Sequence, residues 1–159
     1  IITAEAKTRG HFRKLKVNCI YPPLQLHFSK SDKLAASMFN EQKKLKLVMP
    51  CLGDDYVVRE WLVYKLYNLV TPKSFRARLV KVNIQDPKSK KDVPPFYGIL
   101  LEEEDQMAKR NGSISLTLKL KPDQTEQQSF LNMAVFEYLI ANTDWSIQYL
   151  QNIKLIAAD

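Results

Sequence analysis

Two polar side chains near the end of the sequence, Asp144 and Asn152, could do chemistry together. Asp144 follows an apolar helical pattern, and Asn152 comes eight residues later, directly before the strand-like residues 153–156. Carboxylate and amide oxygens are the ligands that Mg²⁺ prefers, and a carboxylate beside a hydroxyl group can accept its proton. Both residues are also common turn formers, so a purely structural role is the alternative.

Several charged residues in the first half could act on phosphate. Lys44 and Lys46 alternate on a predicted strand, so both point to the same face of a sheet. Glu60, on the helix predicted to follow, could form an ion pair with one of these lysines. Arg9 and Arg13 lie on either side of a glycine, which lets the backbone approach a phosphate. For each of these residues, the alternative is a solvent-exposed side chain that holds no ligand.

The composition suits one basic domain of 159 residues with a net charge of +7. That charge favours an anionic partner without choosing among nucleotides, phosphoproteins, nucleic acid and acidic lipid. Nucleic acid is the weaker choice, because the aromatic residues fall in apolar registers and not among surface Lys and Arg. No apolar run is long enough to span a bilayer, and no targeting segment indicates a compartment.

Histidine and cysteine are too few for two common kinds of site. With two histidines and two cysteines in the chain, neither a zinc site nor a Ser-His-Asp hydrolase is indicated. Cys19 and Cys51 are expected to be buried free thiols in preference to a disulfide.

The hydrophobic pattern predicts an α+β protein. Helical spacing predicts helices over residues 54–70 and 123–141, and a short helix follows the acidic residues 102–105, whose side chains are expected to face water. Alternation predicts strands at 12–17, 24–28, 45–49, 75–84 and 96–101.

This order of elements is typical of protein-kinase-like folds, and five stretches make a more specific resemblance. The sequence resembles the atypical bacterial kinases of the spore-coat protein CotH family in "RGHFRK", "PPLQLHFSK", "KKLKLVMP" with "YVVREWLVYKLYNLV", "FYGILLEEED" and "NTDWSIQYLQN". The resemblance implies an antiparallel five-stranded N-lobe sheet with one packed helix over residues 1–103. A partial helical C-lobe would follow over residues 104–159, with a catalytic-loop-like segment at 142–152.

The resemblance also implies an activity, the transfer of the γ-phosphoryl group of ATP to a hydroxyl of a protein or small molecule. ATP and Mg²⁺ (or Mn²⁺) would be the cofactors, with Asp144 as the catalytic carboxylate and Asn152 as a metal ligand. Phosphate charge would be neutralised by Lys46 or Lys44 and by Arg9 and Arg13, with Glu60 positioning the lysine.

Three departures from the kinase pattern leave other functions open. The chain has no glycine-rich phosphate loop, the spacing from Asp144 to Asn152 is longer than usual, and the second metal-binding Asp lies beyond the chain or is absent. We therefore expect a fragment of a larger protein, inactive by itself. The alternatives are a non-catalytic basic interaction or scaffold domain with the same fold, and an anion- or nucleic-acid-binding module. The phosphoacceptor, the compartment and the oligomeric state are not predicted.

Overall fold

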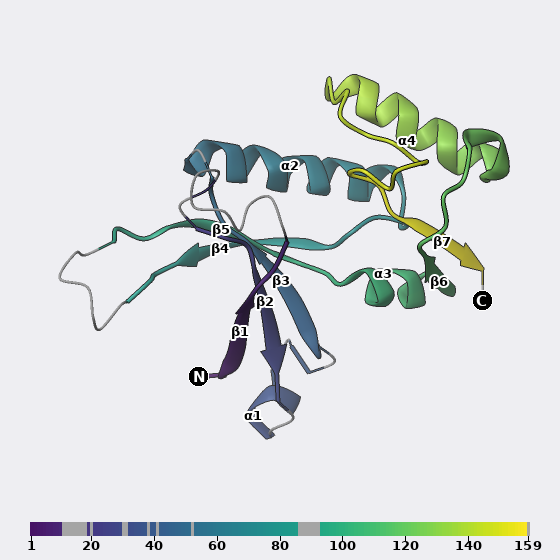
Figure 1. Ribbon diagram of the computed structural model, residues 1–159. Helices are drawn as coiled ribbons and strands as arrows, with labels where there is room; N and C mark the ends of the chain where they lie inside the picture. The colour runs from purple at the N-terminus through teal and green to yellow at the C-terminus, as the bar shows by residue number, and fades with distance from the viewer. Residues whose placement is uncertain are drawn as a thin grey trace. The chain divides into compact units, whose positions relative to one another are not determined.

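The computed structural model describes residues 1–10, 19, 21–29, 32–37, 39–40, 42–51, 53–85 and 93–158 (Figure 1). The chain divides into two compact units, one formed by Ile1–Tyr64 and Arg76–Glu103, and the other by Lys65–Phe75 and Glu104–Asp159. Both units combine helices with strands, so the predicted α+β class is confirmed.

The first unit is built on a five-stranded antiparallel sheet (Figure 1). Its spatial order is β1-β2-β3-β5-β4, for β1 (Ala4–Thr8), β2 (Leu24–Phe28), β3 (Lys44–Val48), β4 (Ala77–Val82) and β5 (Phe96–Leu101). A short helix, α1 (Asp32–Ala35), lies between β2 and β3 in the chain. The long helix α2 (Asp54–Val70) follows β3 and continues into the second unit.

Four of the five predicted strands and the predicted helix 54–70 are confirmed. The predicted strand 12–17 lies outside the described residues. The first strand of the sheet is instead Ala4–Thr8, which the alternation analysis missed because its sequence is short and weakly apolar. Its pairing with β2, from Ala4 opposite Phe28 to Thr8 opposite Leu24, supplies the stability that its own residues lack.

The register of the sheet separates an apolar face from a face that carries polar groups. Leu47 lies opposite Leu24 and Leu100, and these residues belong to the apolar face. The hydrophobic core on this face consists of Leu47, Met49 and Phe96, with Tyr21, Leu24, Leu26, Val80, Val82, Ile84, Val93 and Leu100 packed against them. The next residue along β3 from Leu47, Lys46, therefore points to the other face.

Gly98 of β5 has no room for a side chain. A Cβ there would lie 2.9 Å from Val82 Cγ2 and 3.1 Å from the Val48 carbonyl oxygen. We expect Gly98→Ala to lower the free energy of unfolding by about 1–3 kcal/mol in urea denaturation, because a backbone oxygen cannot move aside as a side chain can. The double variant with Val82→Ala should lose less than the sum of the two single changes. A Gly98→Ala protein as stable as the wild type would contradict this packing.

A disulfide joins Cys19 to Cys51, so the expectation of two free thiols is wrong. Cys19 precedes β2 and Cys51 follows β3. In the antiparallel pair the start of β2 meets the end of β3, with Leu24 opposite Leu47, and the flanking segments are thereby brought together. The two cysteines form a disulfide because these strands pair, and the spacing of the cysteines in the sequence does not reveal that pairing.

The second unit contains the C-terminal part of α2 and five further elements. These are α3 (Glu104–Arg110), β6 (Ser113–Leu116), the 3₁₀ helix η2 (Pro122–Gln124), α4 (Gln127–Leu139) and β7 (Leu155–Ala158), and β6 pairs with β7 in antiparallel fashion. None of the helices in the described part of the chain has the length and apolar content needed to cross a bilayer.

Helix α4 is shorter at both ends than the predicted range 123–141. It begins after Glu126, whose carboxylate accepts hydrogen bonds from the backbone N–H groups of Gln128 at 2.8 Å and Ser129 at 2.7 Å. It ends before Ala141, which has a φ of 55° and turns the chain into the left-handed region. Both ends are thus set by capping, which apolar periodicity does not report.

The Glu126 cap predicts a pH-dependent contribution to stability. Hydrogen bonds from Ser129, first from its side chain, and from the Gln128 backbone lower the pKa of Glu126 from 4.5. A lowered folded-state pKa gives stability that is present above pH 4.5 and is lost as the pH falls through the folded-state pKa. Melting temperatures of wild type and Glu126→Ala should therefore differ at pH 7 and converge as the pH falls below 4.5. A constant difference over this range would contradict the role of the charge.

Candidate functional site

The segment from Asp144 to Asn152 folds into a small hairpin. Ser146 and Gln151 form an isolated antiparallel bridge, with backbone N–H to carbonyl hydrogen bonds of 3.0 Å in both directions. Leu150, inside the turn, has a φ of 51°, and Asn152, just after the bridge, has a φ of 53°. Asparagine tolerates this left-handed conformation better than most residues. The hairpin brings Asp144 and Asn152, which are eight positions apart in the sequence, close together in space.

Asp144 and Asn152 are in direct contact. Asn152 Nδ2 donates to the backbone oxygen of Asp144 at 2.5 Å and to its carboxylate oxygen Oδ2 at 3.2 Å. Gln151 Nε2 donates to the other carboxylate oxygen, Oδ1. All three residues are exposed, so the carboxylate is held in place and still faces solvent. Both hydrogen bonds are donated by the amide nitrogen of Asn152, and neither involves its amide oxygen, Oδ1.

Helix α4 holds this loop. Trp145 packs edge-on against Phe130 with ring centroids 6.4 Å apart, and Ile147 is buried. Asn142 links helix and loop, because its Nδ2 donates to Glu137 Oε2 at 2.6 Å and its Oδ1 accepts from the Asp144 N–H at 3.0 Å. The residues before and after Asp144 are therefore held against helix α4.

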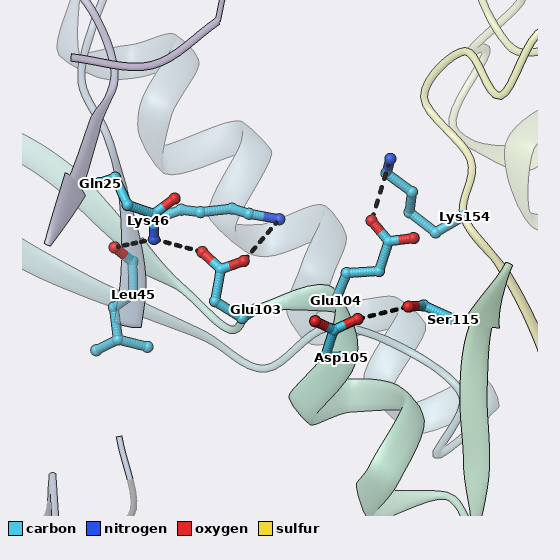
Figure 2. Close-up of polar contacts among 8 residues, drawn as sticks. All are labelled: Gln25, Leu45, Lys46, Glu103, Glu104, Asp105, Ser115 and Lys154. Atoms are coloured by element: carbon cyan, nitrogen blue, oxygen red, sulfur yellow. Dashed lines mark hydrogen bonds and ion pairs between the residues drawn. The ribbon is translucent and has the colours of Figure 1, made fainter. Parts of the chain in front are cut away.

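A second polar cluster, the Lys46 cluster, lies in the first unit on the face of the sheet to which Lys46 points (Figure 2). It consists of Gln25, Lys46 and Glu103. Lys46 lies opposite Gln25 on one neighbouring strand and opposite Leu101 on the other. Glu103 follows Leu101 by two residues, and its Oε2 lies 3.7 Å from Lys46 Nζ, with the two side chains 24% and 11% exposed. Gln25 Nε2 donates to Glu103 Oε1 at 2.5 Å and to the Leu45 carbonyl at 3.2 Å.

The side chains of the acidic stretch do not all face water, as the sequence analysis expected. Glu102 is 6% exposed, and its Oε2 accepts from the Arg76 N–H at 2.9 Å. Glu104 pairs with Lys154 at 3.1 Å within the second unit, and Asp105 accepts from the Ser115 hydroxyl at 2.5 Å (Figure 2). Each carboxylate of this stretch therefore has a specific donor or cationic partner.

The remaining predicted site residues are placed as follows. Lys44 is exposed at the start of β3, opposite His27. Glu60 is half-buried on α2. Arg9 is half-buried and its backbone N–H donates to the Pro23 carbonyl at 2.9 Å. Arg13 lies outside the described residues.

Sequence reasoning missed Gln25, Glu103 and Gln151 as members of these clusters. A signal for Glu103 exists, since a strand continued by two residues keeps the same face, and Leu101 sits opposite Lys46. That signal requires the strand register, which a single sequence does not show. Gln151 carries no signal of this kind, because its contact depends on the hairpin turn.

The donor atoms in the loop suit a hard cation. Mg²⁺ typically takes one or two protein carboxylates and completes its shell with phosphate oxygens and water. Asp144 offers a carboxylate, and Asn152, whose amide nitrogen contacts that carboxylate, carries an amide oxygen on the same exposed loop. Among the described residues, no three His, Cys, Asp or Glu side chains gather as a metal-binding group.

Comparison of the chain with models of protein families, with curated proteins and with solved structures gave no match.

Proposed function

We propose that the chain is part of a kinase-like phosphotransferase of the CotH type, which binds ATP together with Mg²⁺ or Mn²⁺. The observation that carries the proposal is the direct contact of the Asn152 amide with Asp144, which brings a carboxylate and a side-chain amide together on an exposed loop. The sheet order with α2 between β3 and β4, and the lysine on β3, support the same class.

In this proposal each residue has one task. The Asp144 carboxylate orients the acceptor hydroxyl and takes its proton while the hydroxyl oxygen attacks the γ-phosphorus. The bond from the γ-phosphorus to the β–γ bridging oxygen breaks, and ADP leaves with the electron pair. Lys46 neutralises phosphate charge, and Asn152 contributes an oxygen ligand to the metal. Bound Mg²⁺ supplies charge neutralisation on the phosphate oxygens. Rate enhancement comes mainly from positioning and electrostatics.

Nucleotide binding can be tested by thermal shift with ATP, with and without Mg²⁺ or Mn²⁺. A ligand that binds only the folded state stabilises it by about 2.7 kcal/mol at 100 times its Kd. We expect a rise in Tm that requires both ATP and the metal. Asp144→Asn should lose the metal-dependent part, because an amide lacks the negative charge that attracts the cation.

The matched control is Asp123→Asn, which makes the same change at an exposed aspartate of η2. It should keep the metal-dependent shift. A shift that is the same with and without metal, or that Asp144→Asn retains in full, would contradict a metal site at this loop. A chain with no shift at all would favour the non-catalytic scaffold.

A further inference from the structure

In the Lys46 cluster, the carboxylate of Glu103 lies beside the Lys46 ammonium, where an anionic ligand of that ammonium would also bind. Lys46 Nζ and Glu103 Oε2 are 3.7 Å apart, longer than the 2.7–2.9 Å of a charge-assisted hydrogen bond. Glu103 is held more closely by a neutral group, since Gln25 Nε2 lies 2.5 Å from its Oε1. The carboxylate is thus fixed by Gln25 beside an ammonium group to which it is not hydrogen-bonded (Figure 2).

We propose that Glu103 competes with the phosphate groups of the nucleotide for Lys46, and that Gln25 holds it in the competing position. This inference rests on the proposed function, in which Lys46 neutralises phosphate. Because both side chains are largely shielded from water, the charge of Glu103 acts on a nearby phosphate with little screening. A bound phosphate gains the attraction of Lys46 and meets the repulsion of Glu103, so the carboxylate sets an upper limit on nucleotide affinity.

The opposite role for Glu103 predicts the opposite result. A glutamate that positions the lysine for the nucleotide would make binding stronger, and its removal would weaken binding. The geometry favours competition, because Gln25 holds the carboxylate while the 3.7 Å separation leaves the ammonium without a short bond to Glu103.

The test is isothermal titration of the chain with ATP in the presence of Mg²⁺. Glu103→Gln should lower the Kd by about tenfold, the change expected from removing about 1.4 kcal/mol of repulsion. Gln25→Met, which keeps the charge of Glu103 and removes the amide that holds it, should lower the Kd by a smaller factor. It serves as the second variant if Glu103→Gln does not fold. Lys46→Met should abolish measurable binding.

Glu104→Gln is the matched control. Glu104 is the next residue in the chain, its side chain is 18% exposed, and it too is in an ion pair, with Lys154. The change in net charge is the same, so an unchanged Kd in this variant shows that the effect of Glu103→Gln is local. A similar gain in both variants would reduce the inference to an effect of overall charge and overturn it.

The remaining outcomes distinguish competition by Glu103 from the proposed nucleotide-binding function. If the wild type binds, Lys46→Met does not, and Glu103→Gln binds no more tightly than the wild type, competition is wrong and the nucleotide site stands. If neither the wild type nor Glu103→Gln binds ATP, both the proposed function and the inference fail.

Discussion

Removing the Cys19–Cys51 disulfide should lower the free energy of unfolding by about 3–4 kcal/mol, the loop-closure entropy expected for cysteines 32 positions apart. The disulfide restricts the unfolded chain by tying the segment before β2 to the segment after β3. We expect the double variant Cys19→Ser/Cys51→Ser to unfold at a clearly lower urea concentration than the oxidised wild type.

Reducing agent provides the control for this prediction. It should shift the wild-type urea midpoint down to that of the double variant and should leave the double variant unchanged. Two titratable thiols in the native protein without reductant, together with no effect of reductant on the midpoint, would contradict the disulfide.

Replacing Lys46 by Met should cost about 2–3 kcal/mol of stability, a buried-pair value reduced for partial exposure. The substitution leaves the carboxylate of Glu103 shielded from water and without the Lys46 ammonium beside it. A shielded charge that has lost its partner destabilises the folded state. The double variant Lys46→Met/Glu103→Gln should recover much of the loss, because Glu103 no longer carries a charge in the absence of the ammonium. Urea denaturation of the two single variants and the double variant measures the coupling.

Lys154→Met is the comparison for this cycle. Lys154 pairs with Glu104 at 3.1 Å, a shorter distance than that of the Lys46 pair, but its side chain is 41% exposed. Solvent screening should therefore keep its cost below about 1 kcal/mol. If Lys154→Met destabilised the protein more than Lys46→Met, burial would not be what gives the Lys46 pair its strength.

Much of the sheet could be predicted from the sequence because β2 to β5 carry a strong apolar pattern. Such a pattern is visible in one segment at a time, as in the residues around Leu47 or Ile99. Strand β1 is different, since Ala4–Thr8 is largely exposed and owes its conformation to β2. The disulfide likewise depends on the pairing of β2 with β3, which connects segments that are distant in sequence.

The candidate site was predictable in its residue types and not in its contacts. Asp144 and Asn152 stand out because turn-forming oxygen donors flank a short loop after a helix. Their contact, and the part played by Gln151, depend on the left-handed conformations of Leu150 and Asn152. The Lys46–Glu103 pair depends on strand register, which single-sequence patterns do not provide. The helical position of Glu60 is the basis on which the sequence predicts it as a partner of this lysine.

The most direct test of the central claim is to locate the metal on the chain. Backbone amide NMR signals can be recorded with ATP while paramagnetic Mn²⁺ is added in small amounts, since a bound Mn²⁺ broadens only nearby signals. A metal–nucleotide site at this loop predicts selective broadening of residues 142–152 that requires ATP and disappears in Asp144→Asn. Broadening confined to other segments, or equal broadening in wild type and Asp144→Asn, would contradict a metal–nucleotide site at this loop.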